Sequence, residues 1–150
     1  MSNTAMVVAG AIACLGLSGV GSAFGTGFAA SAAVGAWKKC YAAGKPAPFL
    51  LLSFVGAPIT QTLYGMIVMF TMFGKIAVEG AGIPCLLLGI FSGLAIGMSG
   101  LFQGRAGAGA CDAQAETNQG FTNYLAALGI VETVAIFTMV FTLIAIGKIA

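Results

Sequence analysis

The chain has 150 residues, of which 59% are hydrophobic and 7% are charged, with a formal net charge of +2 and no histidine. Roughly a quarter of an average soluble chain is charged, so this composition excludes an ordinary soluble domain and indicates a membrane protein. A spanning helix takes about 20 mostly apolar residues, so the chain has room for about four spans and not for a soluble catalytic domain. The net charge is too small to suggest a nucleic-acid partner.

The first predicted helix covers residues 4–36. The N-terminus lacks the basic region of a secretory signal, and the apolar stretch is longer than in a signal peptide, so we expect this helix to be retained. Glycine is dense in it, and small residues spaced three and four apart let helix backbones approach closely in lipid. If copies of the chain form a ring, the glycine-rich face that includes Gly19 is therefore expected to line its tightly packed inner wall.

The second predicted helix covers residues 49–73 and carries a polar group. Thr60, Gln61 and Tyr64 lie on one face of it, because residues three and four apart are neighbours on a helix. Pro58 cannot donate a hydrogen bond to the carbonyl of Phe54, so it should loosen the helix one turn before Gln61.

The third predicted helix covers residues 84–110 and is again rich in glycine, with Gly100 expected to pack as Gly19 does. It carries Gln103 and, near its predicted end, Arg105. The first and third helices are longer than a bilayer needs, so we expect them to tilt or to project beyond it.

The fourth predicted helix covers residues 121–146, and Glu132 is the only formal charge between Glu116 and Lys148. An ionised carboxylate at mid-bilayer costs a few kcal/mol, so it should be paired, liganded or protonated. No basic residue is expected at that depth, so we do not expect an internal salt bridge to neutralise Glu132.

The second and fourth helices resemble each other. Four residues of one fall opposite four of the other at a constant offset, and "GKIA" closes both segments; the pairs are Ile59 with Ile130, Thr62 with Thr133, Phe70 with Phe141 and Thr71 with Thr142. We interpret the chain as two duplicated helical hairpins, residues 1–75 and 76–150, in which Gln61 lies opposite Glu132. Chance similarity between two apolar helices is the alternative.

Positive charge falls on one side of this arrangement. Lys38, Lys39 and Lys45 lie between the first and second helices, and Arg105 lies near the end of the third. The positive-inside bias predicts that the first and third connections face the cytoplasm and that both termini face outward.

The polar residues of the second, third and fourth helices offer oxygen atoms as ligands for a cation. Thr60, Gln61 and Gln103 would bring side-chain oxygens to Glu132, and hard cations prefer oxygen ligands. A proton site needs little beyond one carboxylate whose pKa is raised by burial, and surplus oxygens would add desolvation cost, so the set favours Na⁺ over H⁺. The alternative is that these side chains merely hydrogen-bond neighbouring helices while Glu132 is protonated.

At these residues the sequence resembles a known family. The segments "APITQTLYG", "GLFQGR" and "GIVET" are similar to the proteolipid of the V/A-type rotary ATPases, the K or c subunit in its four-helix form, and are closest to the bacterial sodium-coupled branch. The resemblance covers essentially the whole chain.

The resemblance implies a site. Glu132 would be the ion-binding carboxylate, and Thr60, Gln61 and Gln103 would supply side-chain oxygens. The backbone carbonyl of Ala57 would be a further ligand, although the family has a larger residue there. Tyr64 would hydrogen-bond the carboxylate and lock the site.

The resemblance also implies a role. The chain would be a non-catalytic, multi-pass subunit of the bacterial plasma membrane, carrying Na⁺, or H⁺, in a homo-oligomeric rotor ring. Its partners would be a stator membrane subunit that supplies a basic residue, a central-stalk subunit and the lipid membrane. The alternatives are a stand-alone four-helix cation transporter or channel, a structural four-span membrane protein and a proton-coupled version of the same rotor subunit.

Overall fold

The computed structural model describes all of residues 1–150 and is entirely helical, without strands. Its elements are α1 (Asn3–Ala42), α2 (Leu51–Gly56), the 3₁₀ turn η1 (Ala57–Ile59), α3 (Thr60–Phe73), α4 (Gly82–Thr117) and α5 (Phe121–Gly147). The segment from α2 to α3 counts as one span, so four helices are long and apolar enough to cross a membrane. The predicted all-α, four-span fold is confirmed.

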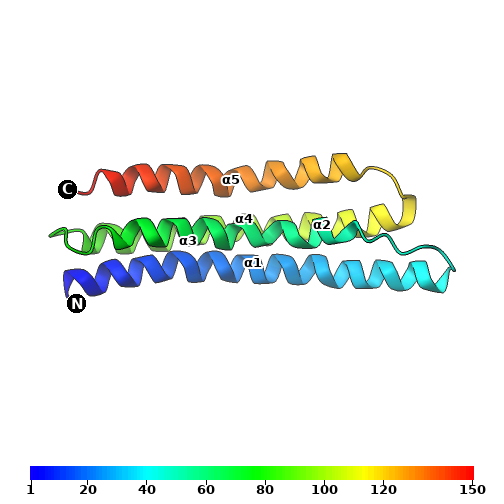
Figure 1. Cartoon of the computed structure of the whole chain (residues 1–150), viewed down its shortest axis with the longest axis horizontal. Helices are drawn as coiled ribbons and strands as arrows, with labels where there is room; N and C mark the ends of the chain where they lie inside the picture. The colour runs from blue at the N-terminus through cyan, green and yellow to red at the C-terminus, as the bar shows by residue number, and fades with distance from the viewer.

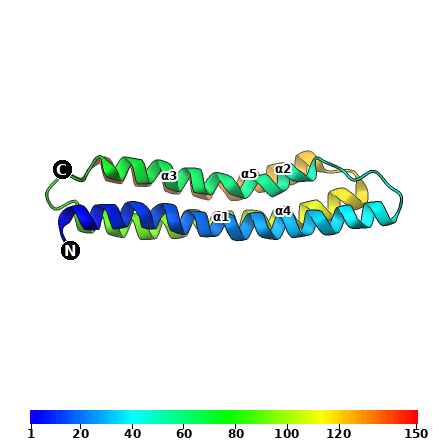
Figure 2. The ribbon, with the colours of Figure 1, turned by 60° about the horizontal axis from the view of Figure 1, so that its bottom comes forward.

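The helices run side by side along the length of the molecule (Figure 1). Both chain termini and the α3–α4 connection lie at one end, and the α1–α2 and α4–α5 connections lie at the other. The second view separates two layers, with α1 and α4 in one and the α2–α3 segment and α5 in the other (Figure 2). Helices of the same layer therefore run parallel, as equivalent helices of two repeated hairpins would.

Two helices are longer than the sequence predicted. The first was expected to end at residue 36 and continues to Ala42, where Gly44, with φ of 64°, follows in the turn. The third was expected to end at residue 110 and continues to Thr117, with Asn118 left-handed at φ of 53°. The prediction placed both ends where the apolar run stops, but a helix continues through polar helix formers until a residue such as glycine or asparagine stops it.

The layer of α1 and α4 is held together by backbone-to-backbone contact. A Cβ added at Gly21 would overlap the carbonyl of Gly97, and one added at Gly104 would overlap that of Gly25. Gly100 belongs to the same seam, because its Cβ would lie 3.3 Å from Ser22 N and from Gln61 Oε1. Gly19 does not belong to this seam, because its Cβ would meet only Thr62 Oγ1, at an ordinary 3.9 Å, within the chain.

The second span breaks at the predicted place. Pro58 lies inside the 3₁₀ turn η1, which separates α2 from α3. The backbone N–H of Thr60 then donates to the carbonyl of Ala57, three residues back. Pro58 has no backbone N–H, so it interrupts the hydrogen bonds of the α-helix, and the chain forms one 3₁₀ turn before α3 begins.

The hydrophobic core is divided into two clusters. One joins α1, α3, α4 and α5 toward the end that holds the termini and includes Cys14, Val68 and Ile146. The other lies toward the opposite end and includes Phe54 and Leu128. The polar residues of the predicted site lie between these clusters along the chain.

Candidate ion-binding site

Glu132 lies about midway along α5, and its carboxylate is held from two helices. The phenol of Tyr64, on α3, donates to Oε1 at 2.6 Å. Gln103 Nε2, on α4, donates to Oε2 at 3.2 Å. Each carboxylate oxygen therefore accepts one hydrogen bond, and the two bonds together fix the orientation of the group.

Gln103 links the carboxylate to the rest of the polar set. Its Nε2 also donates to the backbone carbonyl of Leu128 at 3.1 Å. Its Oε1 accepts a hydrogen bond from Gln61 Nε2 at 2.9 Å. Both glutamines are fully buried, so this chain of amides is the route by which α3 and α4 reach the carboxylate on α5.

The 3₁₀ turn and the first residue of α3 add two more oxygens beside Gln61. Thr60 Oγ1 donates to the carbonyl of Ala57 at 3.0 Å and lies 3.4 Å from Gln61 Oε1. This carbonyl belongs to the turn that Pro58 introduces, whereas a regular helix would pair it with the residue four positions on.

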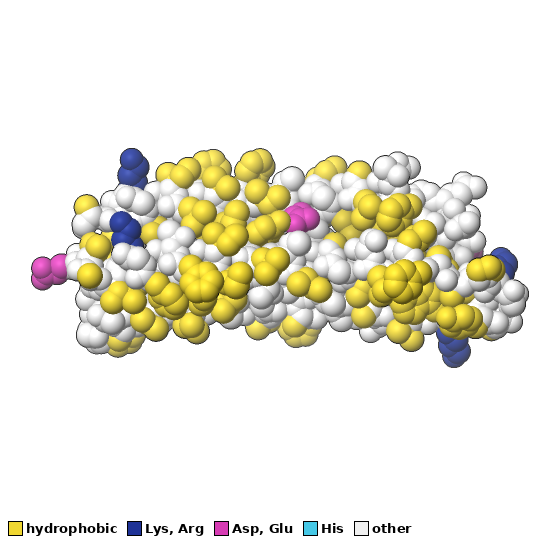
Figure 3. Space-filling model, in the orientation of Figure 1, with side chains coloured by type: hydrophobic (Ala, Val, Ile, Leu, Met, Phe, Trp, Pro, Cys, Tyr) yellow, Lys and Arg dark blue, Asp and Glu magenta, His cyan; other side chains and the backbone are white.

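Glu132 is half-buried and reaches the surface of the α3–α5 layer. The space-filling view shows one acidic group about midway along the face and another at one end, with basic groups toward both ends and apolar or neutral groups between (Figure 3). The ion pair of the molecule lies elsewhere, between exposed Lys39 and Asp112. No basic side chain of this chain neutralises Glu132.

The structure brings together all six residues that the sequence singled out: Ala57, Thr60, Gln61, Tyr64, Gln103 and Glu132. One member of the network, the carbonyl of Leu128, was not predicted from the sequence. Its spacing is the one available signal, since Leu128 lies one turn before Glu132 on the same face of α5.

The arrangement can hold a cation through oxygens. The carboxylate, the Ala57 carbonyl, the Thr60 hydroxyl and the two amide oxygens are hard ligands of the kind that Na⁺ takes. Gln103 turns its Nε2 to Glu132, so its amide must rotate before Oε1 can join the ligands. That torsion is broad and roughly two-fold, so the rotation needs no change of backbone.

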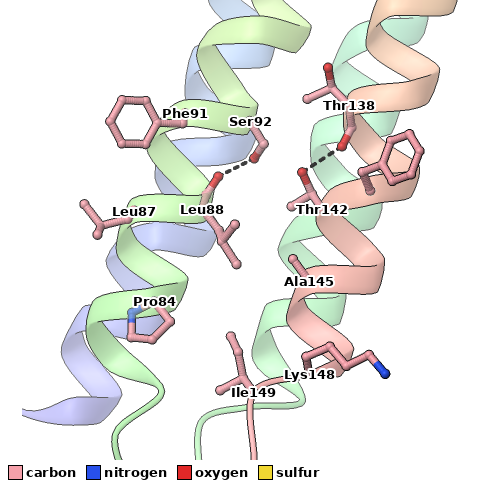
Figure 4. Close-up of a pocket in the computed structure, with 11 residues that line it drawn as sticks. Pro84, Leu87, Leu88, Phe91, Ser92, Thr138, Thr142, Ala145, Lys148 and Ile149 are labelled. Atoms are coloured by element: carbon pink, nitrogen blue, oxygen red, sulfur yellow. Dashed lines mark hydrogen bonds between the residues drawn. The ribbon is translucent and has the colours of Figure 1, made fainter.

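A larger hollow lies apart from these residues. It has a volume of about 830 Å³ and is formed by α4 and α5 toward the end of the molecule that holds the termini (Figure 4). The hydroxyls of Ser92, Thr138 and Thr142 line it, but each donates to a carbonyl of its own helix. With no acidic residue in its wall, the hollow is not a second cation site.

Comparison with known proteins gives one family match. Residues 86–145 match the model of a family described as the C subunit of ATP synthase. The matched segment takes in most of α4 and α5, with Gln103 and Glu132, and makes up less than half of the chain. No curated protein matches the chain. The family match supports an ion-translocating membrane rotor protein that is not itself a catalyst.

Proposed function

We propose that the chain is the rotor proteolipid of a V/A-type rotary ATPase and that it carries Na⁺ on Glu132. The main support is the network at Glu132, a half-buried carboxylate held by Tyr64 and Gln103 beside further oxygens. The family match over residues 86–145 supports the rotor role. The V/A type and the sodium-coupled branch rest on the resemblance of the sequence motifs.

Electrostatics provides the mechanism. An ionised carboxylate that faces lipid is unfavourable, whereas a carboxylate with a bound cation is neutral and can pass through lipid at tolerable cost. The empty, charged site is stable only beside a basic residue of a stator protein or an aqueous path. Rotation of a homo-oligomeric ring therefore carries each ion from one access path to the other.

Energy passes between this ring and the soluble head. Moving one elementary charge across the membrane changes its electrostatic free energy by about 2.3 kcal/mol for each 100 mV of membrane potential. A central-stalk protein would transmit the torque, so that hydrolysis or synthesis of ATP takes place on other chains. In this proposal the protein lies in the plasma membrane of a bacterium, with the α1–α2 and α4–α5 connections in the cytoplasm.

Na⁺ and H⁺ make different use of the amides. A proton needs the carboxylate alone, and Gln103 can keep its present hydrogen bonds. Na⁺ must exchange its hydration shell for protein oxygens, so Gln61 and Gln103 would each turn Oε1 toward the ion. The number of oxygens in the hydrogen-bonded network that ends at Glu132 supports Na⁺.

A carbodiimide that modifies only protonated carboxyl groups tests this assignment. We expect millimolar Na⁺ to slow the modification of Glu132 at fixed pH, because the bound cation displaces the proton. Gln61→Ala and Gln103→Ala should weaken this protection. Gln114→Ala is the matched control, since Gln114 is a buried glutamine of α4 outside the network. Absence of protection by Na⁺ at neutral and mildly alkaline pH would make this a proton site.

A further inference from the structure

The hydrogen bonds of two serines relate α1 of the first hairpin to α4 of the second. Ser22 Oγ accepts from the backbone N–H of Thr62 on α3. Ser99 Oγ donates to the carbonyl of Val131 on α5. Each serine thus joins the first helix of its hairpin to the second, and each lies at the middle of its own helix. The two hairpins therefore correspond in the register that pairs Ser22 with Ser99.

In this register, a face that is covered on α1 is exposed on α4. Four residues of α1 lie in close backbone contact with α4: Gly10, Cys14, Gly21 and Gly25. Their equivalents form a stripe of large, exposed apolar side chains, the α4 stripe: Leu87, Phe91, Met98 and Phe102. Figure 4 shows Leu87 and Phe91 on the side of α4 away from α5. The second hairpin covers this face of the first hairpin, so the α4 stripe is where a further hairpin would lie.

The exposed face of α1 is hollow where the α4 stripe is bulky. An open groove of about 490 Å³ runs between α1 and the segment from η1 to α3, and Ala23 and Gly27 belong to its wall. A Cβ added at Gly16 or at Gly27 would meet nothing within 4 Å. Gly16, Ala23 and Gly27 are the equivalents of Gly93, Gly100 and Gly104, the α4 residues that α1 covers. We call this face of α1, with Gly16, Ala23 and Gly27, the α1 groove.

The spacing of the α4 stripe matches that of the α1 groove. Phe91 and Phe102 lie about three helical turns apart on α4. Gly16 and Gly27 are separated by the same number of residues on α1. Because α1 and α4 run parallel, copies with the same orientation in a membrane can bring both rings over both glycines at once (Figure 2).

We propose that the α4 stripe of one copy packs into the α1 groove of a second copy, so that the seam between α1 and α4 continues from chain to chain. Within the chain, Gly25 lies against Gly100 and Gly104. The equivalent contact between copies places Phe102 against Ala23 and Gly27 of the second copy.

The occupant of the α1 groove is a helix because small residues let helices approach closely in lipid. The stripe and the groove lie on different helices, so the contact is head-to-tail and repeats from copy to copy. Large side chains fill the seam between copies, which is therefore wider than the backbone-to-backbone seam within each chain. This inference rests on the homo-oligomeric assembly of the proposed function.

Cysteine cross-linking tests the pairing. The full-length chain carries Phe102→Cys together with Gly27→Cys and is treated in mild detergent with a short reagent that joins two thiols. We expect a ladder of cross-linked multiples of the chain on a denaturing gel, because the two positions of one chain lie on opposite outer faces of α1 and α4. The matched control pairs Phe102→Cys with Gly35→Cys, about 12 Å further along α1, and should give no ladder. The wild type should give none either, since its cysteines are buried.

The size of the side chain at position 27 provides a second test that needs no added thiol. Gly27→Leu fills the α1 groove, so native mass spectrometry should find single chains in place of the oligomer. Adding Phe102→Ala makes room for the leucine and should restore the oligomer. Gly35→Leu, on the same helix, should keep the oligomer. Circular dichroism on each variant ensures that the comparison is made between folded proteins.

The possible failures point to different errors. A wild-type oligomer that gives no ladder with the Gly27 and Phe102 pair, or equal ladders with both pairs, would overturn the proposed contact and leave the rotor role in place. Retention of the oligomer by Gly27→Leu would do the same. A wild type that is a single chain would contradict the rotor role itself, and the contact between copies with it.

Discussion

Among single residues, one carboxylate decides what this protein can carry. Glu132 is the one acid within the spanning helices that is attached near mid-depth, and two donors from different helices fix its orientation. The neighbouring oxygens come from α3 and α4 and from the 3₁₀ turn before α3. No other side chain of the molecule can take over the charge of Glu132.

Glu132→Gln should therefore abolish ion transport and leave the protein inserted and assembled. The amide has nearly the shape of the carboxylate, but it cannot carry the charge that a cation or proton must neutralise. ATP-driven uptake of ²²Na⁺ into vesicles that contain the whole complex measures the loss. Glu116→Gln, in the exposed last turn of α4, is the control. Transport near the wild-type rate in Glu132→Gln would remove this residue from the mechanism.

Tyr64→Phe should weaken Na⁺ binding without abolishing it. The lost hydrogen bond, at 2.6 Å, has a charged acceptor, and such a bond contributes about 1.5–3 kcal/mol, so affinity should fall by about tenfold or more. The Na⁺ concentration that half-protects Glu132 from the carbodiimide provides the measurement. Tyr124→Phe removes a hydroxyl from a ring that packs against Phe54, and it should leave that concentration unchanged. Equal values for both variants would show that Tyr64 does not lock the site.

Among the elements, an irregular turn and a glycine seam position these residues. The 3₁₀ turn η1 places the carbonyl of Ala57 beside Thr60 and orients Gln61 toward α4. The seam between α1 and α4 sets the position of α4, and hence of Gln103. Neither element contacts Glu132, yet each determines where its partners lie.

Pro58→Ala should weaken Na⁺ binding while the protein stays folded. With an N–H at position 58 the helix can continue through this region, and the carbonyl of Ala57 returns to the regular ladder. A loss of about tenfold in affinity, or 1.4 kcal/mol, is the expected size. Pro84→Ala is the control, because Pro84 lies in the first turn of α4, where no helical hydrogen bond is missing. Unchanged affinity in Pro58→Ala would mean that the Ala57 carbonyl is not a ligand.

Gly21→Ala should lower thermal stability in detergent. The added methyl group would overlap the carbonyl of Gly97 and force α1 and α4 apart, and overpacking of this kind costs about 1–3 kcal/mol. Gly35→Ala, also on α1, meets nothing within 4 Å and should be neutral or slightly stabilising, since alanine favours helix. Melting followed by circular dichroism compares them. Equal melting temperatures would contradict the close packing of the seam.

For the molecule as a whole, apolar side chains reach the surface along its length, as on the face that Figure 3 shows. Large hydrophobic side chains are exposed on all four spans, among them Phe24, Phe70, Phe91 and Phe137. Lipid or further copies of the chain can cover such a surface. A repeated head-to-tail contact between copies closes into a ring when its rotation allows.

Native mass spectrometry in mild detergent should find an oligomer of many identical chains. This follows from the proposed rotor role, because one copy alone cannot carry ions between two separate access paths by rotation. Glu132→Gln should give the same mass, since it removes a charge and not a contact between copies. A stable single chain that still transports Na⁺ would instead identify a stand-alone transporter.

Features that depend on neighbours along the chain could be predicted from the residues alone. The four apolar spans follow from composition, because backbone groups in lipid must be paired within a helix. The break at Pro58 follows from its missing N–H. The polar set was recognisable because charged and amide side chains are costly in such helices, and so Thr60, Gln61, Tyr64, Gln103 and Glu132 stood out.

Features that depend on which helix faces lie together needed the folded structure. It separated Gly21, in contact with α4, from Gly19, which faces elsewhere, although both belong to the same glycine-rich run. It showed that the Gln103 amide turns its nitrogen to Glu132 and to the carbonyl of Leu128. It also placed Arg105 well inside α4. The end of an apolar run predicts where a helix leaves the membrane, whereas the helix itself ends only at a stop residue such as Asn118. Contacts of this kind join residues from separate helices, and no local pattern of residue types records them.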